Sequence, residues 1–513
     1  MRSKDKSTNS SKGILSAIER VGNKLPHPAT IFVILCAIIV VVSAIMAKMG
    51  VSVTYTGLDR STMEIKEMTA SVVSLLTPEG IRYMFTSAVS NFTSFAPLGT
   101  VLVALLGVGV AEGTGLIGTL LTKLVTSTPK RLITVVVVFA GVMSSIASDA
   151  GYVVLVPLGA IVFLSFGRHP MAGLAAAFAG VSGGYSANLL AGPTDALLAG
   201  ISTEGAKLFS DSASVGAADN WYFIFVSTFV ITIIGTIVTE KIVEPKLGEY
   251  KGDEKATISE ITPEQKRGLK FAGIATLIFL ALISICLLPN GVLRNPETNE
   301  ILKSPFMDSI VLIISLLFFI PGVAYGVGCK TVRNDKDVIS LMGKSMSTMG
   351  GYIVLVFFAA QFVQYFSYTN IGIVIAVNGA NFLEGAGFTG IPLIVSFVLL
   401  TAFINLFMGS ASAKWAIMAP VFIPMLMQLG NSPALVQMAY RIGDSTTNII
   451  SPLMSYFALI VAFAEKYDKK SGVGTLITTM VPYSIAFLIG WTILLIIWFI
   501  FNLPLGPGVG VMM

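Results

Sequence analysis

The stretches SSIASDAGY (Ser144–Tyr152) and NLFMGSASAKW (Asn405–Trp415) decide how this chain is organised. The first lies midway along the apolar region 131–167 and the second midway along the apolar region 387–429. Each stretch carries mainly Ser, Ala and Gly with one charged residue. A turn joining two complete membrane spans would be polar and charged, because it would reach water. Irregular backbone at membrane depth is tolerated only where protein encloses it. We therefore predict two re-entrant hairpins with enclosed tips.

The composition of the whole chain identifies an integral membrane protein. Of 513 residues, 54% are hydrophobic and 12% charged, with a mean hydropathy of +0.82, whereas soluble domains carry about a quarter charged residues. Three scattered cysteines and two histidines exclude a disulfide framework and a histidine-rich metal site. The net charge of +5 therefore concerns orientation in the membrane and does not indicate nucleic-acid binding.

Hydropathy predicts an all-α polytopic fold in which nine transmembrane helices accompany the two hairpins. Residues 1–27 form a cytoplasmic segment, in which the apolar spacing of residues 14–21 fits an interfacial helix or a disordered tail equally well. Residues 243–267 form a cytoplasmic linker. The predicted spans are 28–50, 97–122, 171–202, 219–242, 268–289, 306–329, 346–376, 433–464 and 474–503.

The distribution of basic residues supports this count. With the N-terminus inside, cytoplasmic segments hold 24 of the 33 Lys and Arg residues and external segments hold six, as the positive-inside rule requires. The first hairpin then enters from the cytoplasm and the second from outside. Two similar units of opposite orientation make an inverted repeat. The predicted parts are the first two spans with an external loop (28–122), the first unit (131–242), spans five to seven (268–376) and the second unit (387–503).

Matching spacings in the two units support the repeat. Asp149 and Ser412 occupy the same place, since an aromatic residue follows each after three positions and a proline after eight. About thirty residues further on, each unit has a helix broken by an Asn-to-Pro stretch, SANLLAGPTDALLAG (Ser186–Gly200) and GDSTTNIISPLMS (Gly443–Ser455). Paired interrupted helices are the best sequence indication of a transporter's binding site.

The ionisable residues inside the membrane gather at these breaks. Burying one charge in a bilayer costs at least about 2.5–3.5 kcal/mol, so each needs a reason. Asp149 and Lys414 lie at the hairpin tips, where they either take part in transport or cap the backbone. Asp195 follows the first break and either carries the coupling ion or caps the restarting helix. Arg441 and Asp444, three residues apart, are expected to pair, in the site or between helices.

Three neutral side chains complete the candidate site. Trp415 suits stacking on a ring-bearing ligand, although simple packing would also explain it. Asn188 and Asn448 offer oxygens to Na⁺ or amides to a carboxylate; satisfying freed backbone groups is the alternative. A Na⁺ site near Asn188, Asp195 and Asn448 is therefore an expectation, with Na⁺ or H⁺ as coupling ion and no other cofactor. No HExxH, Walker A or GxSxG arrangement supports an enzyme.

Five blocks of the chain together resemble one known family. The resemblance extends over essentially the whole chain and is to the p-aminobenzoyl-glutamate transporter (AbgT) family. It implies nine spans with two oppositely inserted hairpins, a dimer in the bacterial inner membrane, and uptake of p-aminobenzoyl-glutamate or export of sulfonamides and p-aminobenzoate. The blocks are ERVGNKLPHPATIF, SSIASDAGYVVLVPL, SGGYSANLLAGPTDALL, GSASAKWAIMAPVFIPML and YRIGDSTTNIISPLM.

The resemblance also implies what the chain transports and which residues take part in transport. The sequence therefore predicts a secondary transporter for an aromatic carboxylate, with the lipid bilayer and a second copy of the chain as partners and no nucleic acid. A Na⁺-coupled dicarboxylate or citrate carrier is the alternative within transport; a channel or a membrane enzyme would not explain the inverted repeat. The residues that match the family pattern are Asp195, Asn405, Ser412, Trp415, Arg441, Asp444 and Pro452.

Overall fold

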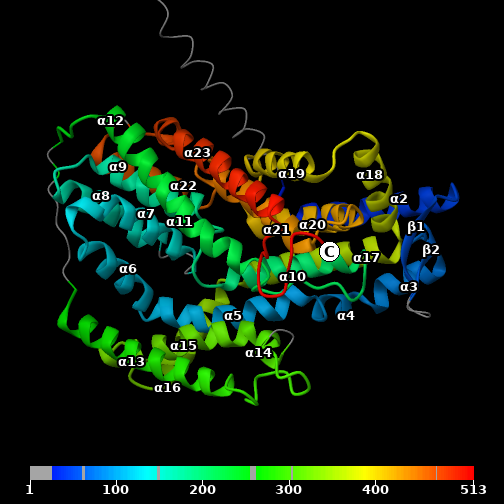
Figure 1. The fold of residues 1–513 in the computed structure, drawn as a ribbon, viewed down its shortest axis with the longest axis horizontal. Coiled ribbons are helices and arrows are strands. Elements are labelled where there is room, and N and C mark those ends of the chain that lie inside the picture. Colours follow the sequence, from blue (N-terminus) through cyan, green and yellow to red (C-terminus); the bar gives the residue numbers. More distant parts are fainter. Residues whose placement is uncertain are drawn as a thin grey trace, which may run out of the picture.

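A computed structural model, shown in Figure 1, describes most of the chain. The described residues are 26–59, 64–146, 151–252, 254, 261–301, 304–469 and 471–513. The expected interfacial helix at residues 14–21 and the tip residue Asp149 lie outside these ranges.

Seven helices in the described residues are long and apolar enough to cross a membrane. Three of the seven have a proline in the first turn, where the missing N–H costs nothing. A broken helix in each repeat unit lies where the sequence predicts spans 171–202 and 433–464. The seven are α2 (Pro28–Lys48), α5 (Ala96–Gly113), α11 (Trp221–Val238) with its continuation η5 (Thr239–Val243) and α12 (Glu244–Leu247), α13 (Pro263–Cys286), α15 (Ile310–Cys329), α17 (Gly350–Tyr368) and α23 (Val473–Ile500).

The first unit has the predicted hairpin followed by the predicted broken helix. The hairpin arms are α7 and α8, and the broken helix is α9 and η4, an irregular stretch, and then α10. In Figure 1, α8 and α9 lie near the left end of the long axis. The bounds are η1 (Lys130–Leu132), α7 (Ile133–Met143), η2 (Ser144–Ile146), η3 (Gly151–Leu155), α8 (Val156–Ser165), α9 (Pro170–Phe178), η4 (Ala179–Gly183) and α10 (Pro193–Lys207).

The second unit repeats this order, with its hairpin based near α18 at the right of Figure 1. The arms α19 (Gly390–Asn405) and α20 (Ala411–Gln428) precede a broken helix made of α21 (Pro433–Asn448) and α22 (Phe457–Tyr467). The last helices of the two units, α11 and α23, pack on each other. The Trp491 Nε1–H donates to Ser227 Oγ at 2.8 Å across this contact. The fold class predicted from the sequence is confirmed.

Two predicted spans were wrong in extent, and for the same reason in both. Span 97–122 ends at Gly113, because Gly115 adopts a left-handed φ of 91° and α6 (Leu116–Thr126) starts in a new direction. Span 346–376 ends at Tyr368, where Asn370 has a φ of 59° before α18 (Ile371–Gly385). The two short helices then bend by 113° and 119° into the first hairpin arms. The repeat is therefore longer than predicted, since a short helix precedes each hairpin.

Sequence analysis did not predict the small antiparallel hairpin that follows α2. Its strands are β1 (Ser52–Asp59) and β2 (Glu64–Ser71), with Ser52 opposite Ser71. It lies at one end of the long axis beside α3, opposite the end that carries α9 and α12 (Figure 1). The remaining short helices are α3 (Pro78–Thr86), α4 (Ala88–Thr93), α14 (Pro305–Asp308) and α16 (Asp335–Ser347).

Candidate substrate and coupling site

A cavity of about 220 Å³ lies where both hairpin tips meet both broken helices. A water molecule takes about 30 Å³ of liquid, so the cavity has room for about seven waters, or for an organic acid of one ring. Its lining is about half polar. The lining residues are Ser145, Tyr152, Tyr185, Thr194, Gly409, Ala411, Asn448, Met454, Ser455 and Tyr456.

Three tyrosines form the aromatic wall of this cavity, and sequence analysis did not propose them. The rings of Tyr152 and Tyr456 stack with centroids 4.5 Å apart. The Tyr185 hydroxyl lies 3.3 Å from Thr194 Oγ1. The repeat contained a signal for Tyr152, because it occupies in the first unit the place of Trp415 in the second. In the sequence analysis, this aromatic position was used only to align the two units.

A buried ion pair between the two units lies next to this wall. The Arg441 Nη1–H of α21 donates to Asp195 Oδ1 of α10 at 2.6 Å, and both residues are at most 5% exposed. The other oxygen of Asp195 accepts the Gly192 N–H at 2.7 Å. Asp195 thus caps its helix and also pairs with a charge. Arg441 Nη2 reaches the Ser186 carbonyl at 3.5 Å, beside the lining residue Tyr185.

The predicted pairing of Arg441 with Asp444 is wrong. Asp444 Oδ1 lies 2.5 Å from Lys414 Nζ, while Arg441 pairs with Asp195. The two residues are neighbours along α21, but each pairs with a residue of another helix. Lys414 of α20 pairs with Asp444, and Asp195 of α10 pairs with Arg441. The same helix therefore carries two separate buried ion pairs, one within the second unit and one between the units.

Asn405 joins the tip of the second hairpin to α21. Its Nδ2 donates to the Asp444 carbonyl at 2.7 Å and to Thr447 Oγ1 and Asn448 Oδ1, both at 2.9 Å. Asn448 also lines the cavity. In the first unit, the Asn188 Nδ2 donates to Ser145 Oγ of the hairpin tip at 2.9 Å. An asparagine at the break of each broken helix therefore bonds to the hairpin tip of its own unit.

The other predicted site residues lie around the cavity without lining it. Trp415 is fully buried, stacks on Tyr440 at 4.3 Å, and donates from Nε1 to Ser202 Oγ at 2.9 Å. Ser412 and Pro452 are half-buried, in the first turn of α20 and in the second break. The roles of these three residues in substrate binding, and a shared Na⁺ site of Asn188, Asp195 and Asn448, stay predictions.

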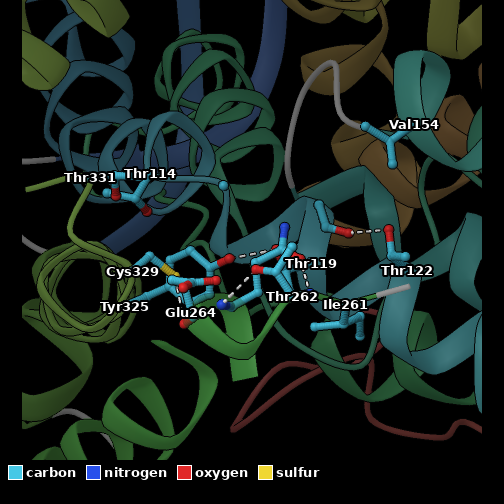
Figure 2. A pocket seen from close by; sticks show the side chains of 13 residues that line it. Thr114, Thr119, Thr122, Val154, Ile261, Thr262, Glu264, Tyr325, Cys329 and Thr331 are labelled. Carbon is cyan, nitrogen blue, oxygen red and sulfur yellow. Dashed lines mark hydrogen bonds between the residues drawn. The ribbon is translucent and has the colours of Figure 1, made fainter. Parts of the chain in front are cut away.

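A larger cavity of about 470 Å³ lies elsewhere, between α6, α13 and α15 (Figure 2). Its threonine hydroxyls already have partners: Thr119 bonds Tyr325 at 2.6 Å and Thr122 donates to the Gly118 carbonyl at 2.8 Å. Among the described residues that line it, the charged one is the acid Glu264 and none is a Lys or Arg. Arg441 does not line the smaller cavity, but its guanidinium reaches the Ser186 carbonyl beside the lining residue Tyr185. Because an anionic substrate needs a positive charge nearby, the smaller cavity is the better candidate.

Comparison with known proteins identifies the family. Residues 13–513 match the AbgT transporter family (ABG_transport). The chain belongs to the AbgT transporter family. It is 40% identical over 504 residues to the p-aminobenzoyl-glutamate transport protein of Escherichia coli (strain K12), covering 98% of both chains. It is therefore a multi-pass membrane transporter of small molecules, as predicted.

Two solved AbgT-family structures have the same fold. The Neisseria gonorrhoeae MtrF structure, described as illuminating a class of antimetabolite efflux pumps, has a TM-score of 0.91 and 51% identity over 97% of this chain and 100% of that one. The Alcanivorax borkumensis YdaH transporter, described as having an unusual topology, has a TM-score of 0.88 and 47% identity over 94% of this chain and 100% of that one.

Proposed function

We propose that this AbgT-family chain is a secondary active transporter of p-aminobenzoyl-glutamate or related aromatic carboxylates and antimetabolites, such as p-aminobenzoate and sulfonamides. A proton or Na⁺ gradient would drive it. The relatives named above support the substrate class, and the cavity between the hairpin tips supports a binding place reached from alternate sides.

The observation that carries this proposal is the Arg441–Asp195 pair beside the cavity. A guanidinium can hold a carboxylate through two parallel hydrogen bonds, and the Nε–H of Arg441 has no partner in the described part of the chain. A substrate carboxylate could therefore bind Arg441 through Nε and take the place of Asp195. Buried hydroxyls without partners among the described residues occur on both broken helices, at Ser186 in the first break, Ser445 on α21 and Ser451 in the second break.

The aromatic wall favours a ring-bearing substrate over the alternative of a Na⁺-coupled dicarboxylate or citrate carrier. Tyr152 and Tyr456 present a stacked aromatic surface to the cavity, and stacking contributes about 0.5–1.5 kcal/mol beyond area burial. A small aliphatic acid needs no such surface. Competition by citrate or succinate that equals competition by p-aminobenzoate would favour the alternative.

Asp195 is proposed as the coupling carboxylate. While it pairs with Arg441, whose guanidinium cannot lose its proton, the carboxylate has a permanent counter-charge. When a substrate carboxylate takes over Arg441, Asp195 loses that counter-charge and can accept a proton. Substrate binding and proton uptake would then be linked at one arginine.

Flux in proteoliposomes tests both the function and the coupling ion. Labelled p-aminobenzoyl-glutamate and p-aminobenzoate are followed under a pH gradient alone and under a Na⁺ gradient alone. We expect saturable, pH-driven flux in the wild type and at least about a tenfold loss, or about 1.4 kcal/mol, in Asp195→Asn. Wild-type pH-driven flux in that variant would remove Asp195 as proton carrier. Flux driven only by Na⁺ would assign Na⁺ as the coupling ion.

We also propose a homodimer in the bacterial inner membrane with a cytoplasmic N-terminus; the resemblance supports the dimer and the charge bias supports the orientation. Met513 is 61% exposed at the C-terminus, and Lys469 is exposed between α22 and α23. With the three native cysteines replaced, an impermeant thiol reagent added outside cells should label Met513→Cys and not Lys469→Cys. The reverse labelling would invert the orientation.

A further inference from the structure

The Lys414–Asp444 pair fastens the second hairpin to the broken helix. Lys414 and Asp444 are each 1% exposed. Besides the Asp444 carboxylate, the Lys414 ammonium donates to Asn405 Oδ1 and to the Met408 carbonyl, the latter at 3.3 Å. The ammonium thus connects both arms of the hairpin tip to α21. Gly409, the residue after Met408, lines the cavity, so these contacts lie next to it.

The inverted repeat shows that the fold does not need this pair. Lys414 comes directly before Trp415, and its counterpart before Tyr152 is Gly151. Asp444 precedes Asn448 by four residues, and Gly184 precedes Asn188 by four. An added Cβ at Gly151 of the hairpin would lie 2.9 Å from Val181 Cγ1 of the broken helix, and one at Gly184 would lie 2.7 Å from Val142 Cγ2 of the hairpin arm α7. The first unit therefore closes the same junction by tight packing, without charge.

The two ion pairs on α21 differ in what their cations can do. The guanidinium of Arg441 stays protonated under all conditions in proteins, whereas a buried lysine can exchange its proton. An ammonium removed from water is stabilised only by its partners. Loss of one proton would therefore weaken every contact that the tip makes through Lys414.

We propose that Lys414 and Asp444 form a proton-operated latch on the second hairpin. Protonated Lys414 holds the tip closed on α21. When an N–H bond of the ammonium breaks, its electron pair stays on the amine nitrogen, the proton passes to cavity water as hydronium, and Asp444 remains a carboxylate. The ion pair is then lost and the tip is released. The latch rests on the proposed function, because opening a hairpin by proton release drives transport only in a coupled carrier.

Three tyrosines and Arg441 lie near the latch. The Tyr440 ring lies 5.9 Å from Lys414 Nζ. Tyr152 and Tyr185 lie within electrostatic reach of Asp444, and Arg441 acts on Tyr440 and Tyr185. Tyrosines ordinarily titrate near pH 10, and Arg441 is permanently charged and paired with Asp195. Of the two ion pairs on α21, Lys414–Asp444 is therefore the one whose cation, Lys414, can release a proton.

Thiol labelling tests the latch without any substrate. In full-length protein in lipid nanodiscs, with native cysteines replaced, Ala413→Cys reports on the tip, because Ala413 is fully buried and reacts only when the tip opens. Thiolate formation itself rises with pH, so the measured quantity is the labelling rate with Lys414 divided by the rate with Lys414→Arg. Arginine keeps the charge and cannot release the proton.

We expect this ratio to rise by at least about tenfold between about pH 6 and about pH 9, since a one-proton equilibrium shifts about tenfold per pH unit. Lys414→Met should label rapidly at every pH. Lys207→Arg is the matched control, because Lys207 pairs with Glu204 at the surface of α10, and it should leave the profile unchanged. Gel filtration confirms that each variant folds.

A ratio that stays constant with pH would overturn the latch. If that happens while the wild type still transports aromatic acids, the latch alone fails. If the ratio rises while no aromatic acid is transported, the latch stands and the proposed substrate class is wrong. Asp195→Asn should retain the pH-dependent labelling, which separates the latch from the coupling carboxylate.

Discussion

Arg441→Ala is expected to reduce transport in proteoliposomes by at least about 100-fold and to destabilise the protein. Removing one partner of a buried ion pair leaves the other as an uncompensated charge, at a cost of about 3–5 kcal/mol. Here that charge is Asp195, which is 5% exposed. The variant also removes the guanidinium proposed to bind the substrate carboxylate. Flux, ligand binding and thermal unfolding measure the two effects separately.

The double variant Arg441→Ala with Asp195→Ala separates the structural role from the binding role. With both charges gone no uncompensated charge remains, so the unfolding temperature should recover most of the loss. Transport should not recover, because the substrate carboxylate still lacks its partner. A double variant that transports at the wild-type rate would show that Arg441 serves only to neutralise Asp195.

Gly443→Ala is expected to reduce transport by at least about tenfold through packing alone. Gly443 lies between Arg441 and Asp444 on α21, where an added Cβ would lie 2.7 Å from Thr401 Cβ and 2.8 Å from Ala402 N on α19. The two helices would have to separate, and overpacking of this kind costs about 1–3 kcal/mol. The displacement would misalign both ion pairs, so loss of flux should accompany a lower unfolding temperature.

Gly343→Ala on α16 is the matched control, since an added Cβ there meets nothing within 4 Å. In a helix interior that change stabilises by about 0.5–1 kcal/mol, so the unfolding temperature should rise slightly with flux unchanged. Equal flux in Gly443→Ala and in the wild type would show that the α19–α21 contact tolerates separation, and that ion-pair geometry does not limit transport.

The membrane class, the hairpins and the broken helices could be predicted because their signals are local. Apolar runs have to match the bilayer thickness, and Ser, Ala and Gly without charged turns indicate enclosed tips. The spacings after Asp149 and Ser412 then revealed the repeat. The ends of spans 97–122 and 346–376 were missed, because Gly115 and Asn370 adopt left-handed conformations within sequence that remains apolar on both sides.

The candidate site was predicted in part. Sequence analysis placed Asp195, Lys414, Arg441 and Asp444 at the hairpin tips and breaks. The structure buries all four, with Arg441 and Asp444 inside α21, which stays helical as far as Asn448. It did not identify the tyrosine wall, since an aromatic residue in an apolar segment gives no sign of whether it faces lipid, core or cavity. Trp415 illustrates the ambiguity, because its ring packs on Tyr440 and does not face the cavity.

Only the tertiary structure decided which charges pair. From the sequence, Arg441 and Asp444 are neighbours on one helix face, whereas the actual partner of Arg441 is 246 residues away. The helices α10 and α20 approach α21 from different units and bring Asp195 and Lys414 to it. A local pattern fixes which residues share a helix face, but a buried charge pairs with the opposite charge that the packing of distant helices brings closest.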